Sequence, residues 1–486
     1  MTNLLDAMGG ARATSLLIGG ELLAGEGEAF DVHDPATEAT LASPRAASLR
    51  QVEQAVASAR AAFHGGTWGD AEKRSRCITR LADLIEQNSE ELLALIVAEV
   101  GTPITTARSL QVPGATAHLR HAAQAALRDR DVDLGRHELP VPSRSQIFYR
   151  PVGVVAAISA YNYPLLTACA KLGGAWAAGC TTVLLPSSLT PLGVLRFAEL
   201  VLEAGFPPGV FNLVLGGPEV GEALTGHPGL DKVTFTGSVR TGRSVMRQAA
   251  ANVTGVTLEL GGKSAAILLP GEDYAPVVEP IHARYLRNAG QGCQSPTRIL
   301  VERARLDEFL TLSSAYFRTV KVGDPWDADT LVGPLITAVH RDWVERFVAD
   351  AVDRGARIVA GGGRPDQARG HFMNPILIAG VTNSDPIVRE ELFAPVGIVL
   401  PYDDIEQAVA IANDSDLGLA ASLFGDAAQC AQIAPRLRVG TVSINNGGGL
   451  RADAPLCGFG DSGIGSEGGE DGVREFLKTQ HVQVAL

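Results

Sequence analysis

Residues 152–185 read VGVVAAISAYNYPLLTACAKLGGAWAAGCTTVLL. Val152–Ile158 and Thr181–Leu185 are short apolar runs of the length and composition typical of buried strands. Leu165–Ala178, which lies between them, has the length expected of a helix. The order strand, helix, strand indicates two parallel strands of one sheet, with the helix packed on a face of that sheet.

The same alternation continues on the C-terminal side of this stretch. The next expected elements are a helix over Leu192–Glu203, a strand over Phe211–Leu215, a helix over Val220–Thr225 and a strand over Lys232–Phe235. This order predicts an α/β fold with a doubly wound parallel sheet, an arrangement that holds dinucleotides. A second α/β unit is expected after Glu259, with Ala265–Leu269 as its first strand. Its helices are expected over Leu306–Val320, Arg341–Asp353 and Ile405–Asn413.

The two ends of the chain complete the outline. Apolar residues recur at helical spacing before the sheet, at 52–63, 78–85 and 92–97. This spacing predicts three helices. Two further segments, Ser145–Tyr149 and Gln480–Leu486, alternate polar and apolar side chains, as exposed strands do.

Composition limits the classes of protein to which the chain can belong. Its 486 residues suggest two to four structural units, and 46% hydrophobic with 20% charged residues is typical of a globular protein. The formal net charge of −13 argues against a nucleic-acid or anionic-membrane partner, because surplus Lys and Arg hold both. Six cysteines form no C-x-x-C pair and no cluster with histidine, which argues against a zinc site and a disulfide framework. Reduced cysteines suit a cytoplasmic protein.

One uncharged segment, Leu172–Leu195, is long enough to span a bilayer. Glycines and prolines interrupt it, and Ser and Thr residues gather between positions 181 and 190. A buried helix, a strand and a turn explain this pattern better than a membrane span. Met1–Gly20 has no basic region leading into an apolar block, so no secretory leader is expected.

Two glycine-containing segments carry the strongest candidates for chemistry. Residues 288–293 read NAGQGC, and residues 258–263 read LELGGK. We interpret Cys293 as a nucleophile, because a thiolate attacks carbonyl carbon well and later departs easily. We interpret Glu259 as its general base, because apolar surroundings raise the pKa of a carboxyl group into a useful range. Taken alone, each residue would more often be a buried thiol or a structural acid.

Five separated motifs place these two residues in a wider pattern. In chain order they are AYNYP at Ala160–Pro164, FTGS at Phe235–Ser238, LELGGK at Leu258–Lys263, GQGC at Gly290–Cys293 and EELFAP at Glu390–Pro395. Their order and spacing over nearly the whole chain resemble the aldehyde dehydrogenase superfamily. The resemblance implies an enzyme that oxidises an aldehyde to a carboxylic acid with NAD, or with NADP. The expected route runs through a thiohemiacetal and a thioester on the cysteine, and water activated by the glutamate hydrolyses the thioester.

The resemblance also implies roles for other side chains. Asn162 follows a strand on a turn, and its NH2 group and the backbone N–H of Cys293 would donate to the developing oxyanion. Lys171 matches a family lysine suggested as part of a proton path, and a solvated lysine is the alternative. Phe235–Ser238 looks like the turn that meets the cofactor pyrophosphate, and Glu391 matches the glutamate that holds the nicotinamide ribose. The expected cofactor-binding residues are Ile158, Ser159, Ala160, Tyr161, Leu185, Ser188, Gly216, Phe235, Thr236, Gly237, Ser238, Gly242, Leu260, Glu391 and Phe393, and no metal site is expected.

The sequence departs from the family pattern just after the second strand of the opening stretch. Where the family usually has Lys-Pro-Ser-Glu, this chain has LPSS at Leu185–Ser188. The missing lysine normally bonds the adenosine ribose, and the missing glutamate helps to hold its hydroxyls. Ser188 no longer repels a 2′-phosphate, yet no lysine at this position attracts one. The sequence therefore favours NAD with weakened adenosine contacts and leaves NADP open.

The family pattern also implies domains and partners. A dinucleotide-binding domain is expected at 1–132 and 152–258, a catalytic domain at 259–476, and an arm at 133–151 and 477–486 through which subunits exchange strands in a homodimer or homotetramer. By family analogy, the residues that face the aldehyde are Tyr163, Leu166, Leu456 and Gln294. They suggest a largely apolar pocket and an aliphatic or aromatic aldehyde.

Two other functions remain open from the sequence. A CoA-acylating semialdehyde dehydrogenase would pass the acyl group to coenzyme A, but that branch typically lacks a glutamate at the position of Glu259. A non-catalytic family member with a structural role is the other alternative, and Leu185 favours it by weakening the grip on a cofactor. The presence of Cys293, Glu259 and Asn162 together argues against it.

Overall fold

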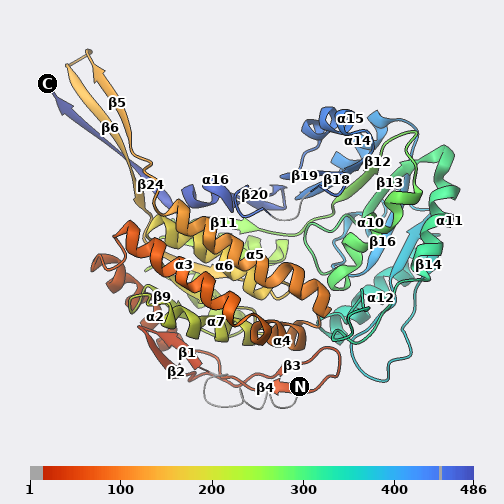
Figure 1. Cartoon of the computed structure of the whole chain (residues 1–486), viewed down its shortest axis with the longest axis horizontal. Helices are drawn as coiled ribbons and strands as arrows, with labels where there is room; N and C mark the ends of the chain where they lie inside the picture. Colours follow the sequence, from red (N-terminus) through yellow and green to blue (C-terminus); the bar gives the residue numbers. More distant parts are fainter. Residues whose placement is uncertain (1–14, 448–450) are drawn as a thin grey trace.

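The computed structural model describes residues 15–447 and 451–486 of the chain. The first 14 residues of the predicted dinucleotide-binding domain, which also make up most of the segment considered for a secretory leader, lie outside the described residues. Two α/β bodies lie side by side, and a long arm projects away from one of them (Figure 1).

The first body is built on an eight-stranded sheet with the strand order β2-β1-β9-β8-β7-β10-β11-β22. The five strands from β9 to β11 in this order run parallel, and the strands outside them are antiparallel. The strand bounds are β1 Ser15–Ile18, β2 Glu21–Ala24, β7 Val154–Ile158, β8 Thr181–Leu185, β9 Phe211–Leu213, β10 Lys232–Thr236, β11 Gly255–Glu259 and β22 Gly463–Ile464. The five parallel strands at the centre of this sheet, with helices on both faces, confirm the predicted doubly wound sheet. β22 comes from the segment predicted as the second domain, yet it extends this first sheet.

Helices cover both faces of this sheet (Figure 1). They are α2 Leu49–His64, α3 Ala71–Gln87, α4 Ser89–Val100, α5 Ile104–Ala125, α6 Pro164–Ala178, α7 Leu192–Glu203, α8 Pro218–Thr225, α9 Val239–Ala250 and α16 Gly469–Arg474. The three helices predicted from apolar spacing near the N-terminus are confirmed as α2, α3 and α4, and most of their apolar residues are buried in the first core. α6 begins one residue earlier than predicted, at Pro164, because the fixed φ of proline suits the first helical position.

The second body contains a seven-stranded sheet with the order β14-β15-β16-β13-β12-β18-β19, parallel except for β14. Its strands are β12 Ala265–Leu268, β13 Arg298–Glu302, β14 Arg357–Gly361, β15 Ile376–Ala379, β16 Val396–Tyr402, β18 Ala420–Phe424 and β19 Thr441–Ile444. Its helices are α10 Ala275–Leu286, α11 Leu306–Phe317, α12 Ala338–Asp353, α13 Pro386–Arg389, α14 Ile405–Asn413 and α15 Ala427–Ile433. α11 ends three residues before the predicted Val320, because the N–H groups of Thr319 and Val320 donate to carbonyls three residues back, in tighter turns.

The arm consists of β5 Val132–His137, β6 Ser143–Pro151 and β24 Leu477–Ala485. β6 lies in the middle, and β24 pairs with it in antiparallel register from Leu477 opposite Pro151 to Ala485 opposite Ser143. Figure 1 shows these strands extending from the first body, with the C-terminus near their tip. The alternating tail is therefore a strand, as predicted.

The uncharged segment at 172–195 forms the end of α6, all of β8 and the start of α7. Its apolar residues are buried in the first core, Trp176 completely, except Leu189, which is 39% exposed. In the described part of the chain, no helix combines the length and apolar character that crossing a bilayer requires. The interpretation of this segment as a helix, a strand and a turn is confirmed.

Candidate active site

The carboxyl ends of four neighbouring parallel strands open on one large cavity. Leu185, Ile158, Thr236 and Glu259 are the last residues of β8, β7, β10 and β11, and all four line the cavity. Its volume is 2440 Å³, and residues of the second body, Cys293 among them, complete its wall. Ligands of doubly wound sheets bind at this edge of the strands. The fold therefore brings the predicted nucleophile and base to a common cavity.

A strained turn precedes Cys293. Asn288 and Ala289 have φ angles of 53° and 52°, in a left-handed region that costs a residue with a side chain about 1 kcal/mol. The side chain of Asn288 holds the turn: its Oδ1 accepts a hydrogen bond from the Thr102 hydroxyl, and its Nδ2 donates to the carbonyl oxygen of Asn162 at 3.2 Å. The turn is thus fixed against the loop that carries the predicted oxyanion donor.

Gln291, which is fully buried, links the nucleophile loop to the predicted cofactor side. Its Oε1 accepts hydrogen bonds from the Tyr161 hydroxyl at 3.2 Å and the Ile336 N–H at 3.0 Å, and its Nε2 donates to the Asn288 carbonyl at 3.0 Å. Its own carbonyl accepts from Nδ2 of Asn162 at 2.9 Å. One amide hydrogen of Asn162 is therefore donated to the loop that carries Cys293, and the second is available to a ligand.

The Cys293 thiol is harder to ionise than an ordinary cysteine. Burial raises its pKa to about 12, and the negative charges of Glu391 and Glu259 act in the same direction. The sequence-based interpretation began from a thiolate. In the free protein the group is a thiol, so a base must remove its proton before or during attack.

Glu259 has the properties of such a base. Burial raises its pKa well above the ordinary glutamate value, and the charge of Glu467 raises it further. Both of its carboxyl oxygens are buried and have no hydrogen-bond partner among the described residues. A buried carboxylate without donors binds a proton readily, because protonation removes an uncompensated charge.

Lys171 lies behind the cavity and not on its wall. Its side chain is completely buried, so the alternative of a solvated lysine is wrong. Its Nζ forms an ion pair with Glu467 and donates to Oγ1 of Thr234 at 3.3 Å. Glu467 lines the cavity, close enough to Glu259 to raise the pKa of that acid. Lys171 thus contacts the cavity wall through Glu467, and its charge acts to lower the pKa of Glu259.

Glu391 packs against the glycines that follow Glu259. The N–H of Gly262 donates to its Oε1 at 2.9 Å. A Cβ at Gly261 would lie 2.0 Å from Oε2 of Glu391, and a Cβ at Gly262 would lie 2.3 Å from the carbonyl oxygen of Cys293. Only glycine permits this close approach at either position. Burial raises the pKa of Glu391 to about 7.

All the predicted cofactor-binding residues line the cavity except Gly242. A Cβ at Gly242 would lie 2.5 Å from Cδ2 of Leu260, so this glycine lets α9 approach the cavity wall from behind. The hydroxyls of Ser159 and Thr236, at the ends of β7 and β10, are buried without a hydrogen-bond partner in the described chain. Ser238 caps the twelve-residue helix α9, whose N-terminus suits a phosphate. These unsatisfied polar groups fit a dinucleotide.

The segment Leu185–Ser188, which departs from the family pattern, lies on the wall of the same cavity. Leu185 is only 4% exposed and packs into the first hydrophobic core, so it offers the cavity no polar group. Ser188 is half-buried and also lines the cavity. Nothing at these two positions carries a positive charge toward a 2′-phosphate.

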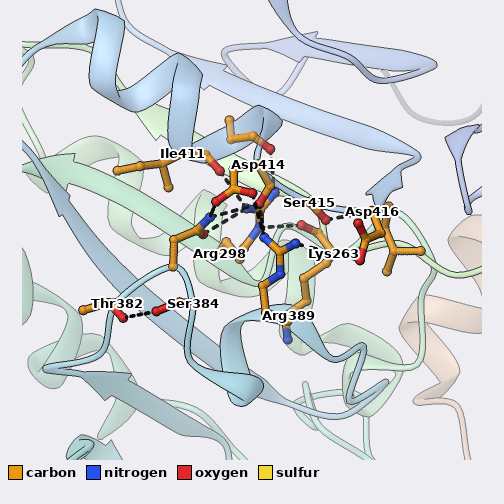
Figure 2. A network of polar contacts seen from close by, with 12 residues as sticks. Lys263, Arg298, Thr382, Ser384, Arg389, Ile411, Asp414, Ser415 and Asp416 are labelled. Atoms are coloured by element: carbon orange, nitrogen blue, oxygen red, sulfur yellow. Dashed lines mark hydrogen bonds and ion pairs between the residues drawn. The ribbon is translucent and has the colours of Figure 1, made fainter.

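A polar network, buried at Arg298 and exposed at Asp414, joins the loop that follows Glu259 to the segment that precedes Glu391 (Figure 2). Arg298, at the start of β13, donates to the Lys263 carbonyl at 2.7 Å and to two carbonyls at the end of α14 at 3.0 and 2.8 Å. Arg389, next to the segment that carries Glu391, pairs with Asp414 at 3.1 Å. Burial and the charge of Arg389 lower the pKa of Arg298 to about 10. The network fixes the loop after β11 and the turn after α13 against one another.

Several charged groups on the cavity wall were not among the predicted site residues, and Glu467, Arg284 and Arg287 are three of them. Glu467 belongs to a glycine-rich stretch that carries no recognisable motif for an acid. Arg284 and Arg287 lie at the C-terminal end of α10, immediately before the nucleophile loop. Two arginines three residues apart in front of NAGQGC were the available signal. Within residues 15–447 and 451–486, no group of three His, Cys, Asp or Glu side chains could hold a metal ion, and all six cysteines are free.

Comparisons with known proteins agree with this site. A model of the aldehyde dehydrogenase family matches residues 22–482. Geranial dehydrogenase of Castellaniella defragrans is 36% identical over 473 residues, which cover 96% of this chain and 98% of that protein. Betaine aldehyde dehydrogenase of Staphylococcus aureus in complex with NAD+ superposes with a TM-score of 0.96 at 34% identity, covering 100% of this chain and 97% of that one.

A mutant of aldehyde dehydrogenase C of Pseudomonas syringae in complex with NAD+ and octanal superposes with a TM-score of 0.92 at 40% identity. That match covers 97% of this chain and 96% of the other. The family match and the extent of these likenesses leave one conclusion. The chain belongs to the aldehyde dehydrogenase family.

Proposed function

We propose that this chain oxidises an aldehyde to a carboxylic acid with NAD+, with Cys293 as nucleophile and Glu259 as general base. The observation that carries the proposal is the single cavity that both side chains share with the predicted dinucleotide-binding residues. The similar solved structures that contain NAD+ support this choice of cofactor. NADP+ remains the second candidate, because Ser188 presents no negative charge.

The first half of the reaction makes a bond between Cys293 and the substrate. Glu259 takes the thiol proton, and the sulfur attacks the aldehyde carbon to give a thiohemiacetal. The free amide hydrogen of Asn162 and the backbone N–H of Cys293 donate to the oxyanion that forms. When bound, NAD+ accepts the hydride that leaves the thiohemiacetal carbon, and a thioester remains on the sulfur. Glu391 would hold the nicotinamide ribose.

The second half releases the acid. Glu259 removes a proton from water as the water attacks the thioester carbonyl, and Cys293 departs as the leaving group. The buried, unpaired oxygens of Glu259 suit it to this step, because a carboxylate with a raised pKa is a stronger base. Glu467 and Lys171 lie behind Glu259 and provide a route by which its proton can leave. The presence of Glu259 favours hydrolysis over transfer to coenzyme A.

The substrate is an aldehyde with an apolar body, aliphatic or aromatic. Tyr163, Leu166 and Leu456 line the same cavity as Cys293, together with Gln294. Apolar side chains there would cover a hydrocarbon chain next to the carbonyl. We place the protein in the cytoplasm, which its six free cysteines support.

A panel of aldehydes assayed with NAD+ and NADP+ tests the proposal. We expect formation of reduced cofactor with a matching amount of carboxylic acid, faster with NAD+ than with NADP+. Coenzyme A should change neither the product nor its amount. An acyl-CoA product would instead support the acylating alternative. The absence of turnover, together with no thermal shift by either cofactor, would support the non-catalytic alternative.

We also propose that the arm joins subunits into a homodimer or homotetramer. β24 lies at the edge of the arm sheet, and every residue of this strand after Leu477 is exposed in the single chain. Long unpaired edges are usually covered in proteins, because they pair readily with other strands. The expected domains at 1–132 with 152–258 and at 259–476 remain part of this proposal.

Removal of the last strand should dissociate the assembly. A variant that ends at Lys478 loses the residues that pair with β6 from Ser143 to Tyr149. We expect light scattering to give the mass of one chain for this variant and of two or four chains for the full protein. A variant that lacks only Leu486 is the control and should keep the full mass. A monomeric full-length protein, or an unchanged mass after truncation, would contradict the proposal.

A further inference from the structure

The turn that carries Glu391 has a strained backbone. It comprises Glu390–Pro395, between α13 and β16. Phe393, two residues after Glu391, has a φ angle of 52°, in the left-handed region that is unfavourable for a residue with a side chain. Such a conformation persists only where the surrounding groups fix it. The contacts of this turn therefore determine where the Glu391 carboxylate lies.

The turn packs against the loop that carries the nucleophile. A Cβ at Gly290 would lie 2.2 Å from the carbonyl oxygen of Ala394, so only glycine allows this approach. The ring of Phe393 meets the ring of Tyr161 edge-on, with 6.0 Å between their centroids. The turn therefore contacts both the loop before Cys293 and the loop after β7, where the proposed reaction brings cofactor and aldehyde together.

A histidine from α12 holds the middle of the turn. The Nε2 atom of His340 lies 2.9 Å from the carbonyl oxygen of Leu392. A carbonyl oxygen can only accept, so Nε2 carries a hydrogen and donates it. Leu392 is 3% exposed, and no other donor in the described part of the chain bonds to its carbonyl. Burial lowers the pKa of His340, which favours the neutral ring, although the bond to Leu392 acts in the opposite direction.

The ring of His340 is itself fixed by the start of its helix. Thr337 caps α12, and its side chain accepts the backbone N–H of His340 at 3.1 Å. The ring of Trp343 lies 5.9 Å from that of His340, and both residues line the cavity. Just before the cap, the N–H of Ile336 donates to Oε1 of Gln291 at 3.0 Å. One helix start is thus bonded both to the nucleophile loop and to the turn.

A purely structural role explains only part of this arrangement. A side chain that satisfies a buried carbonyl stabilises a fold wherever it lies. The carbonyl that His340 holds, however, belongs to the residue between Glu391 and Phe393, which are both expected to contact the cofactor. Loss of this bond would therefore displace cofactor-binding groups before it affected the rest of the fold.

We propose that His340 is a positioning residue for the nicotinamide end of the cofactor. Its bond to Leu392 sets the places of the Glu391 carboxylate and the Phe393 ring, and thereby raises the affinity for NAD+ and the rate of hydride transfer. His340 acts through the turn, so the aldehyde is bound independently of it. The inference rests on the proposed function and adds to it a side chain that no sequence motif contains.

Replacement of His340 by leucine, asparagine and glutamine tests the inference. Leucine cannot donate, the asparagine amide is too short to reach Leu392, and the glutamine amide nitrogen can take the place of Nε2. In His340→Leu and His340→Asn, calorimetric titration should give a Kd for NAD+ raised about 5- to 20-fold, the effect of leaving a buried acceptor without its donor. In His340→Gln, the Kd should return to within about threefold of the unmodified value.

Kinetics of the same variants separate positioning from a general loss of stability. With saturating NAD+, the first turnover of NADH in His340→Leu should be slowed about 10-fold or more, because a small misplacement of reacting groups is costly. The KM for the aldehyde should stay within about twofold. Melting temperatures establish that each variant is folded, and His340→Asn serves where the leucine variant is not.

His33 provides a matched control. It is exposed in β3 (Val32–His33), its Nδ1 lies 3.4 Å from the Thr40 hydroxyl, and it is not on the cavity wall. His33→Leu should leave both the Kd for NAD+ and the first turnover unchanged. An unaltered Kd in His340→Leu and His340→Asn, or an equal loss in His340→Gln, would overturn the positioning role and leave the proposed function standing. Failure of the unmodified protein to bind NAD+ or NADP+ and to oxidise any aldehyde would overturn both.

Discussion

Replacement of Cys293 by alanine is expected to abolish aldehyde oxidation, with kcat reduced at least about 10⁴-fold. The reason is chemical: without the sulfur, no covalent adduct forms, and the aldehyde has no route for losing a hydride. Cofactor binding should survive, because the predicted dinucleotide contacts come mainly from the ends of β7, β8 and β10 and from α9. Steady-state kinetics measures the loss, and calorimetric titration with NAD+ measures the retained binding.

Cys457 provides a matched control for this substitution. It is also half-buried, and it lies close enough to Glu259 for the charge of that acid to raise its pKa. It is not on the cavity wall. Cys457→Ala should therefore retain turnover. If Cys293→Ala keeps dehydrogenase activity while Cys457→Ala loses it, the nucleophile has been assigned to the wrong sulfur.

Replacement of Glu259 by glutamine is expected to lower steady turnover about 10²- to 10⁴-fold. Gln has nearly the shape of Glu and cannot accept a proton, so both the activation of Cys293 and the hydrolysis of the thioester lose their base. NADH should appear in a single slow turnover, at high pH where the thiol ionises without help, and then stop. Stopped-flow absorbance follows this step. Glu390→Gln, a change at an exposed acid on the same wall, should leave turnover unaffected.

The same residue determines the expected pH dependence. A general base acts only when deprotonated, and burial raises the pKa of Glu259 well above its ordinary value. Activity of the unmodified protein should therefore be low in mildly acidic solution and rise with pH through the raised pKa. In Glu259→Gln this rising limb should disappear, and only the ionisation of Cys293, at a pKa raised to about 12, should remain. If activity of Glu259→Gln rises over the same pH range as that of the unmodified protein, the ionisation that controls activity belongs to another group.

Much of the fold could be predicted from local sequence. The strands β7 and β8 and the helices α6 and α7 are apolar and regularly spaced, and they are bounded by glycine or proline at several ends. Several predicted boundaries shifted by one to three residues: α6 begins early at Pro164, which suits the first helical position, and α11 ends early, where tighter turns follow it. The place of β22 was not foreseeable, because two residues in a glycine-rich loop carry no periodic signal, and only β11 gives them a partner.

The candidate active site could be predicted where a motif contains its residues. Cys293, Glu259 and Asn162 were recognised from short sequence motifs, and the structure brings all three to one cavity. The environment of each group was harder to foresee. Lys171 is buried because Glu467, far along the chain, supplies its counter-ion. The raised pKa of the nucleophile likewise depends on acids that only the fold brings near.

Arg284 and Arg287, which line the cavity, were a further omission. The sequence shows Arg284 and Arg287 as ordinary residues near a helix end, where basic side chains are common. Whether a charge has a partner is a property of the tertiary structure. Only the absence of a nearby carboxylate in the described chain distinguishes these two arginines from paired ones such as Arg196.

Mass spectrometry of Glu259→Gln, quenched after one turnover with NAD+ and an aldehyde that the unmodified protein oxidises, tests most directly whether sulfur and carboxylate act on the same acyl group. We expect the peptide that contains Cys293 to carry the mass of the substrate acyl group as a thioester, and the unmodified protein to carry little. Hydroxylamine should remove the added mass. An acyl group on another residue would contradict the assignment of Cys293, and no acyl group after NADH has formed would contradict the covalent route.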